Sequence, residues 1–442
     1  MGNPILNNLI IAEKQQPLYS DFYCEQNNVI FPISVNITAS DILRLCDGSN
    51  SKDDIVLFLS KKYNECEEKV REMVSEFLDT SQKMGYILYE KEANKRNVKK
   101  YGNREYWTPD LVAIELTHNC PLKCKHCYID AGIGHNIDTT IVTKLIDECA
   151  SMGVFQLQLT GGEPLVHPDF FYILDYAMNK KMSVGVFSSG YLCSDEVFDK
   201  LDRWKGNPRL SFQISVDGLS QYHNDFRGKH DSFENAIQFI NRLVDLDIIT
   251  YVGTCVGEQS YEELKELGLL IKKMGAKVYR ISSITDRGRA KNNIKKLNIQ
   301  KKALVKKYTK DLSLELNDEF FKVLFFEESD MNINYKYKQN CGLGQTVLKI
   351  DPTGNVYPCL LSDVKYASIN NLSLSDLQKR YSRFWEKVHS PSELTCKDCE
   401  NKELCSNCVC EGSVFCDFEE SIFYSDLNKI KEQISKANGE SI

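Results

Sequence analysis

The stretch from residue 110 to about residue 290 repeats one pattern, a short β-branched run followed by an amphipathic helical stretch. The expected strands are 112–117, 155–160, 184–188, 210–216, 249–256 and 277–283. The expected helices between them include 138–152, 168–181, 232–246 and 260–274. Repeated strand–helix units form a parallel sheet with right-handed crossovers. The pattern therefore predicts an α/β fold, a partial (β/α)6 TIM-like barrel over 109–290, with a doubly wound open sheet as the alternative.

The flanking segments follow other patterns. Residues 1–90 combine short strand candidates with three helical stretches, as in a small α+β domain. Residues 91–108 begin with a polar, basic run and are expected to form a linker. Residues 291–335 are expected to be a connector, and 336–420 hold a field of cysteines with few periodic elements. Residues 421–442 are expected to be a charged helix or tail.

Charge and hydropathy exclude several classes of protein. The net charge of -7 argues against a general nucleic-acid binder, since such proteins are usually basic. No apolar run reaches the roughly 18 residues that span a membrane, and the N-terminus lacks the pattern of a secretory signal. A cytoplasmic protein is expected, with no nucleic-acid or membrane partner. The 17 cysteines are then more consistent with metal ligands than with disulfides, because the cytosol keeps thiols reduced.

Three cysteines follow the first expected strand with the spacing C-x3-C-x2-C, namely Cys120, Cys124 and Cys127. A loop at this position lies at the C-terminal mouth of a barrel, where such folds place their chemistry. Three thiolates can hold three corners of a cubane iron–sulfur cluster and leave the fourth iron open to a substrate. The alternatives are a zinc site, a plain electron-transfer cluster, and cysteines that are merely buried.

Polar residues also follow the next expected strands. Gly161-Gly162-Glu163 follows the second strand, Ser188 ends the third, Ser215 and Asp217 end the fourth, and Arg227 comes shortly after. Glycines let the backbone approach a ligand closely. Glu163 can accept a hydrogen bond from an ammonium group, and Arg227 can pair with a carboxylate. Because the ends of parallel strands meet at one edge, these residues are expected to surround one ligand.

The cysteine loop and these strand-end motifs resemble the radical S-adenosylmethionine (SAM) superfamily. The resemblance implies a [4Fe-4S] cluster whose open iron chelates SAM, reductive cleavage to a 5′-deoxyadenosyl radical, and hydrogen abstraction from a substrate. It assigns SAM contacts to Gly161, Gly162, Glu163, Ser188, Ser215, Asp217 and Arg227, and no catalytic residue beyond the cluster and SAM. An external electron donor of flavodoxin or ferredoxin type is implied as well. A non-catalytic iron–sulfur electron carrier is the alternative from another class.

The second cysteine field resembles the SPASM domain, which holds two auxiliary [4Fe-4S] clusters and would bring the total to three. The resemblance assigns an outer cluster to Cys396, Cys399, Cys405 and Cys416, and an inner one to Cys341, Cys359 and Cys408. Either Cys410 supplies the fourth inner ligand, or the inner cluster keeps an open iron that could bind a peptide thiolate. A structural zinc site is the alternative.

The order of elements in residues 1–90, with the run Leu43 to Gly48, resembles the winged-helix-like PqqD domain that binds the leader of a precursor peptide. Local runs such as Glu115 to His118 and Asp286 to Ala290 resemble sactipeptide maturases of the subtilosin A type. The resemblance implies a maturase that forms a thioether crosslink in a ribosomally made, Cys-containing peptide. A maturase forming carbon–carbon or other crosslinks and an anaerobic sulfatase maturase remain alternatives.

Overall fold

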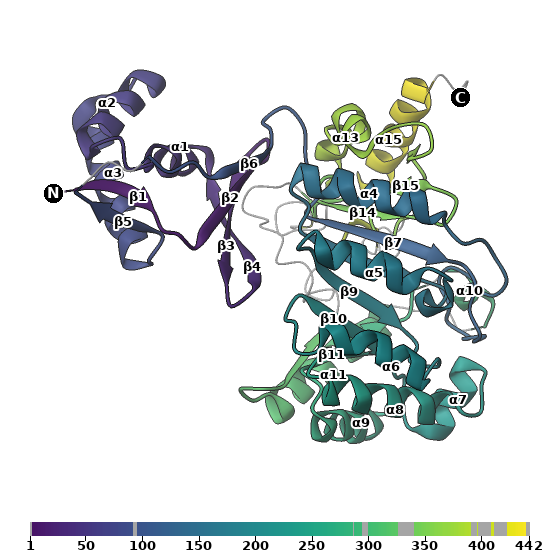
Figure 1. Ribbon diagram of the computed structural model, residues 1–442. Helices are drawn as coiled ribbons and strands as arrows, with labels where there is room; N and C mark the ends of the chain where they lie inside the picture. Colours follow the sequence, from purple (N-terminus) through teal and green to yellow (C-terminus); the bar gives the residue numbers. More distant parts are fainter. Residues whose placement is uncertain are drawn as a thin grey trace. The chain divides into compact units, whose positions relative to one another are not determined.

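The computed structural model describes residues 2–91, 95–285, 287–293, 299–325, 340–389, 396, 408–410 and 422–438. The chain divides into two compact units, Met1–Thr108 and Pro109–Ile442. Figure 1 shows the elements of both units in sequence colours. No helix among the described residues is long and apolar enough to cross a membrane.

The first unit combines six strands with three helices in its described residues. The elements are β1 (Asn3–Leu6), β2 (Ile10–Gln15), β3 (Tyr19–Gln26), β4 (Val29–Asn36), α1 (Ile37–Leu45), α2 (Lys52–Tyr63), α3 (Glu67–Lys83), β5 (Ile87–Glu90) and β6 (Lys99–Gly102). One sheet has the order β4-β3-β2-β6, and β1 pairs with β5 in a second sheet. The helices bury apolar side chains against one another, for example Ile55 and Val74. The strands of the first 27 residues were not anticipated from the sequence.

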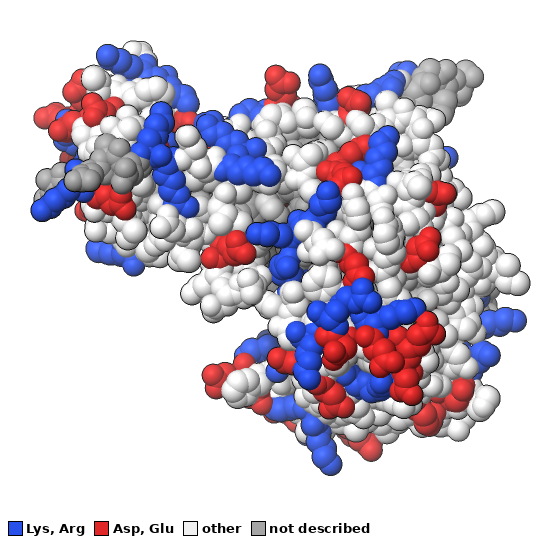
Figure 2. All heavy atoms as spheres, in the orientation of Figure 1, with Lys and Arg blue, Asp and Glu red and all other residues white. Residues whose placement is uncertain are grey.

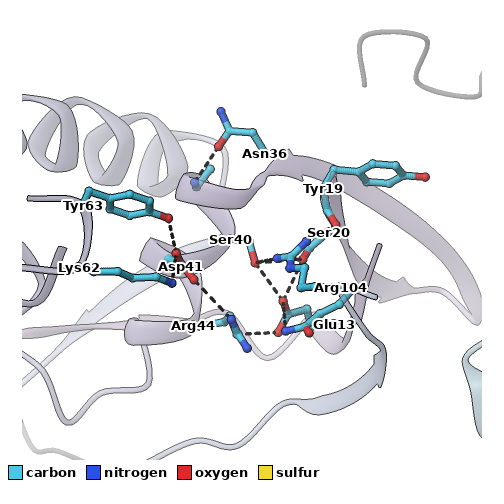
Figure 3. A network of polar contacts seen from close by, with 12 residues as sticks. Glu13, Tyr19, Ser20, Asn36, Ser40, Asp41, Arg44, Lys62, Tyr63 and Arg104 are labelled. Carbon is cyan, nitrogen blue, oxygen red and sulfur yellow. Dashed lines mark hydrogen bonds and ion pairs between the residues drawn. The ribbon is translucent and has the colours of Figure 1, made fainter. Parts of the chain in front are cut away.

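The segment 91–108 is more than a linker. Its strand β6 pairs in parallel with β2, and Arg104 is bound into the polar network of Figure 3. The Arg104 guanidinium donates to the carbonyls of Gln16 and Tyr19 at 2.7 and 2.5 Å, and to the Ser40 hydroxyl at 3.2 Å. Hydrogen bonds that a charged group donates are among the stronger ones in proteins. Residues up to Thr108 therefore complete the first unit.

The second unit begins with alternating strands and helices. They are β7 (Leu111–Thr117), α4 (Thr139–Met152), β8 (Gln156–Gly161), α5 (Phe170–Asn179), β9 (Ser183–Ser188), α6 (Asp195–Leu201), β10 (Leu210–Ser215), α7 (Ser220–Arg227), α8 (Ser232–Asp245), β11 (Ile249–Val256), α9 (Tyr261–Met274) and β12 (Val278–Ser283). Local signals delimit the helices. A capping box between Ser260 and Glu263 starts α9, and Gly153 in a left-handed conformation ends α4.

The remaining described elements are α10 (Ala290–Asn293), α11 (Ile299–Leu316), β13 (Lys322–Phe325), β14 (Val347–Ile350), β15 (Asn355–Tyr357), β16 (Ala367–Ser368), α13 (Leu374–Tyr381) and α15 (Ile422–Asn438). The sheet order is β13-β12-β11-β10-β9-β8-β7-β14-β15-β16, and the pairs from β13 to β14 are parallel. The six strands expected from the sequence are confirmed. The expected connector 291–335 adds β13 beside β12, and β14, from the second cysteine field, adds a strand beside β7.

The two faces of the parallel sheet have different roles. The connecting helices lie along one side of the strands (Figure 1), and alternate residues such as Val184, Val186 and Phe212 are fully buried against them. The intervening residues, such as Gln158 and Gln213, point to the inner side and line a cavity. A strand sends alternate side chains to opposite faces, so one short sequence supplies both the core and the cavity wall.

Acidic and basic residues are interspersed over the face of the molecule in Figure 2. Some of them pair across helices, as Lys265 with Glu315 and Lys272 with Asp318 between α9 and the end of α11. Exposed pairs of this kind each contribute little to stability.

Candidate active site

A cavity of about 260 Å³ lies at the C-terminal ends of the parallel strands. Its wall includes residues of the cysteine loop and the ends of β8 to β12. Of the residues expected to surround one ligand, it includes Cys120, Cys124, Cys127, Gly161, Gly162, Ser188, Ser215 and Arg227. Glu163 and Asp217 lie behind this wall and are completely buried. Residues of five separate sequence segments thus meet at one edge of the sheet, as parallel topology requires.

The cysteine loop is held by hydrogen bonds within the loop itself. The Cys120 amide donates to the carbonyl of Gly132 at 2.9 Å, and the Ala131 amide donates to the Cys127 sulfur at 3.3 Å. Burial raises the pKa of the Cys120 thiol to about 12 and also raises that of Cys124. Buried thiols become ligands when metal binding displaces their protons.

These three thiols fit a cluster with three protein ligands. They line one cavity, whose free space adjoins all of them. The donor set is sulfur alone, which suits iron–sulfur clusters and zinc. Among the described residues His126 also lines the cavity; burial lowers its pKa to about 4, so its ring is neutral, and its Nε2 lies 3.9 Å from Asp217. A cluster held by these three thiols would border the free space of the cavity.

The glycines at the end of β8 allow the backbone to approach the cysteine loop. The Gly162 amide donates to the Thr117 carbonyl at 2.6 Å, and the Glu163 amide donates to the Asn119 carbonyl at 2.9 Å. A Cβ on Gly161 would lie 2.3 Å from the Thr117 oxygen, and Gly161 has a φ of +140°. A side chain at either glycine would push the two segments apart.

Glu163 organises the turn after β9. Its carboxylate accepts hydrogen bonds from the Ser188 hydroxyl at 2.8 Å and from the Ser189 amide and hydroxyl at 2.8 and 2.5 Å. Burial raises the pKa of Glu163, and these hydrogen bonds partly offset that effect. Ser188, expected as a direct ligand contact, thus lies on the cavity wall and also bonds Glu163.

Asp217 and Arg227 form a buried ion pair behind the cavity. Arg227 Nε donates to Asp217 Oδ2 at 2.6 Å, and the Cys255 amide donates to Oδ1 at 2.9 Å. Burial alone would raise the pKa of Asp217, but Arg227, His126 and His223 lower it to about 2. Asp217 is therefore ionised and acts on the cavity through Arg227, which reaches the wall.

Arg227 also borders the sulfur of Cys124, with Nη1 3.7 Å from Sγ. Burial would lower its pKa, but Asp217 and Cys124 raise it above the ordinary value. A permanent positive charge thus stands beside the thiol group that would carry the cluster. This charge stabilises thiolate sulfur and is suited to an anionic ligand group nearby.

Cys255, to which the sequence assigned no role, lies on the cavity wall. Its sulfur, an oxygen of Asp217 and a ring nitrogen of His126 lie within 4.8 Å of one another. Burial raises the pKa of the Cys255 thiol to about 11. Because the Arg227 guanidinium already pairs with the Asp217 carboxylate, the group of Cys255, Asp217 and His126 is part of an ion-pair site rather than a cation site.

Arg289 is a residue of the site that sequence reasoning missed. Its Nε donates to the Cys124 carbonyl at 2.9 Å, and its Nη1 donates to the Ala131 carbonyl at 2.6 Å. The preceding Gly288 is so close that a Cβ would lie 2.4 Å from the Cys127 oxygen. The run Asp286 to Ala290 resembles sactipeptide maturases and so pointed to this segment, but no role for Arg289 followed from the sequence.

A second polar group joins the cysteine loop to β14. Glu115, 1% exposed, accepts from the Tyr128 hydroxyl at 3.3 Å, contacts His118 Nε2 at 3.3 Å and pairs with Lys349 at 3.5 Å. The Lys349 ammonium also lies 4.4 Å from the ring of Tyr357, two residues before Cys359. This group connects the first cysteine loop to the strands that carry the second cysteine field.

The second field is described in part. Cys341, Cys359, Cys408 and Cys410 are described, and Cys359 Sγ lies 3.8 Å from Cys410 Sγ. Cys396 is also described, whereas Cys399, Cys405 and Cys416 lie outside the described residues. The expected outer cluster therefore stays a prediction.

Three family models match separate parts of the chain. They are the radical SAM superfamily over residues 114–271, coenzyme PQQ synthesis protein D (PqqD) over 30–87, and the iron-sulfur cluster-binding SPASM domain over 341–409. The chain is therefore a radical SAM enzyme that carries a PqqD-like domain and a SPASM domain.

Among its relatives is the antilisterial bacteriocin subtilosin biosynthesis protein AlbA of Bacillus subtilis, 27% identical, with 86% of this chain and 85% of that protein covered. The AdoMet-dependent heme synthase of Methanosarcina barkeri is 28% identical, with 68% and 91% covered. The crystal structure of Streptococcus suis SuiB bound to precursor peptide SuiA has a TM-score of 0.61 at 13% identity, with 91% and 94% covered. This last likeness shows a shared fold.

Proposed function

We propose that this enzyme is a maturase that installs a thioether crosslink in a ribosomally made, Cys-containing precursor peptide. The observation that carries the proposal is that one chain joins a three-cysteine cavity to a PqqD-like unit and a further field of thiols. The similarity to AlbA supports it. The matched region covers 86% of this chain, which is more than the second unit alone contains, so the match extends into the first unit as well.

Within the first unit, we place the leader of the peptide at β4. This strand ends the order β4-β3-β2-β6, so one of its edges faces no partner among the described strands. Val29 and Phe31, on one face of β4, are 41% and 39% exposed. An extended peptide can add to such an edge through main-chain hydrogen bonds, with its side chains covering the apolar residues.

In the cavity, Cys120, Cys124 and Cys127 would hold the SAM-binding cluster. With the cluster and SAM bound, the site would supply radical chemistry that takes a hydrogen atom from carbon. Ser188, Ser215 and the glycine turn form the wall on which SAM would lie. Glu163 holds that wall through Ser188 and Ser189, and Arg227 would pair with the SAM carboxylate.

The proposed reaction balances in atoms and electrons. One electron from an external donor of flavodoxin or ferredoxin type cleaves SAM. One hydrogen atom leaves the acceptor carbon for 5′-deoxyadenosine, the peptide thiol loses its proton, and carbon and sulfur join. The one electron left over would pass to an auxiliary cluster held by the SPASM domain. The peptide thus loses two hydrogens.

The test is anaerobic. The protein is reconstituted with iron and sulfide, reduced and given SAM, with and without a candidate precursor, beside a triple Cys120/Cys124/Cys127→Ala variant. We expect 5′-deoxyadenosine from the wild type only, and a two-hydrogen mass loss that disappears when the peptide thiols are blocked. A mass loss that survives thiol blocking would instead indicate a carbon–carbon or ether crosslink. No deoxyadenosine from protein that carries its clusters would refute the enzymatic function.

A further inference from the structure

Four thiols of the second cysteine field lie together. Cys359 Sγ is 3.8 Å from Cys410 Sγ, and the Cys410 thiol also bonds Cys408. Cys341 is close enough to Cys359 and Cys408 for their charges to act on it. Cys341 and Cys410 are each 8% exposed, so both are buried.

The backbone around these thiols is arranged for sulfur ligands. The Cys341 sulfur accepts from the amides of Leu343 and Val409, and the Cys359 sulfur accepts from the amide of Leu361. Hydrogen bonds to sulfur are one means by which proteins stabilise cluster thiolates and set their potentials. They occur here at Cys341 and at Cys359.

The segments that carry the thiols are fixed from outside. The Asn340 side chain donates to the carbonyls of Trp385 and Val388 at 2.7 and 2.9 Å and accepts from the Gly342 amide at 2.9 Å. The Gly344 amide donates to the Pro358 carbonyl at 2.8 Å, which ties the Cys341 loop to the residue before Cys359. Val409, between the other two cysteines, is fully buried.

We infer that Cys410 is the fourth protein ligand of the inner auxiliary cluster, with Cys341, Cys359 and Cys408 as the others. The inference deepens the proposed function and rests on it for the presence of the cluster. With four cysteine ligands no iron would be open, so this cluster would be suited to accept an electron and would not bind the peptide thiolate. Of the two alternatives that the sequence left open, the inference selects Cys410 as the fourth ligand over an open inner iron.

The alternative is that Cys410 is only a buried neighbour. Burial is the ordinary state of a free cysteine. The Cys410 sulfur, however, lies 3.8 Å from the Cys359 sulfur and also interacts with Cys408, so it belongs to the group of four thiols. One short segment supplies Cys408 and Cys410, whereas Cys341 and Cys359 come from two other segments, and Cys410 lies 3.8 Å from Cys359 across that separation in sequence.

The experiment isolates the auxiliary clusters in the full chain. The triple Cys120/Cys124/Cys127→Ala variant is reconstituted, reduced and studied by electron paramagnetic resonance (EPR) before and after a small exogenous thiol is added. The measurement is repeated after C410A or C410S is added to the triple variant. The control adds C193A instead, which removes a half-buried thiol near α6 outside both cysteine fields. Iron and zinc are counted in every sample.

We expect the spectrum with Cys410 present to be unchanged by the thiol. C410A should either lose one auxiliary cluster or gain a new thiol-dependent signal, while C193A behaves as its parent. A thiol-induced shift with Cys410 in place, or a C410A spectrum equal to its parent, would overturn the inference. So would zinc in place of iron. Because the readout is spectroscopic, a failure of peptide crosslinking in a separate assay would overturn the proposed function alone.

Discussion

Arg289 holds the cysteine loop through the loop's own carbonyls, so its removal acts on cluster binding without touching a thiol. Each hydrogen bond from a charged donor contributes roughly 1.5–3 kcal/mol. We predict that R289A lowers the iron bound at Cys120, Cys124 and Cys127, and that R289K restores only part of it because an ammonium lacks the guanidinium fork. Iron content and the EPR change on SAM addition measure this. Full loading in R289A would show that the loop is held by other contacts.

The Asp217–Arg227 pair predicts a non-additive pair of substitutions. R227M leaves a buried carboxylate unpaired, which costs about 3–5 kcal/mol, whereas the double variant D217N/R227M removes both charges and should cost less. Urea unfolding of the wild type, D217N, R227M and the double variant measures the coupling. The exposed pair Lys200–Glu196 serves as the control, and its removal should change stability by under about 1 kcal/mol. Additive losses at Asp217 and Arg227 would contradict a coupled ion pair.

Sequence reasoning found residues whose role follows from local order and missed those whose role depends on distant contacts. The spacing of Cys120, Cys124 and Cys127 and the strand-end position of Gly161 are local, and the structure brings them together. Cys255 differs, because its place on the cavity wall depends on which side of β11 faces inward. Arg289 differs as well, since a loop far along the chain must fold back onto the cysteine loop.

At the scale of elements, the docking of α1 against α2 predicts a pH dependence. Asp41 on α1 accepts from Lys62 and from the Tyr63 hydroxyl, both at 2.5 Å (Figure 3). Burial raises the pKa of Asp41, but these two partners lower it below its usual value overall. A carboxyl group with a depressed folded pKa adds stability above its unfolded pKa of about 3.9, and this is lost as the pH falls through the folded value.

D41N should therefore speed hydrogen exchange of α2 amides at pH 7, by an amount corresponding to about 1 kcal/mol, since Lys62 is partly exposed. The difference from the wild type should shrink below pH 4, after correction for intrinsic exchange. An unchanged difference at low pH would mean that the substitution acts through packing rather than through charge.

The edge strand β4 predicts where the leader binds. F31D places a charge on an exposed apolar position of β4 and should weaken binding of the precursor at least about tenfold, or 1.4 kcal/mol. L88D makes the same change on β5, at a position 43% exposed in the other sheet, and should leave binding intact. Fluorescence anisotropy of a labelled precursor measures both. Equal effects would place the leader away from β4.

At the scale of the whole molecule, the sequence predicted the order of parts better than their limits. The βα repeat identified the barrel because each unit is local. The limit at residue 90 was set by a change in polarity, yet β6 returns to pair with β2, and Gln16 exchanges two hydrogen bonds with the backbone of Thr108 at 2.7 and 2.9 Å. Contacts between the two ends of a domain leave no trace in local composition.

The boundary at Thr108, in place of the expected one at residue 90, predicts the behaviour of two truncated chains. A chain of 109–442 keeps its own unit whole and should cleave SAM without peptide, while its KM for the precursor rises strongly because the PqqD-like unit is gone. A chain of 91–442 retains β6, Trp107 and Thr108 without the strands they pack on, and should aggregate at concentrations where the shorter chain stays monodisperse. Light scattering, deoxyadenosine assays and peptide mass analysis distinguish the two. If 109–442 modified the precursor with an unchanged KM, the leader would not be recognised by the first unit, as expected for an anaerobic sulfatase maturase.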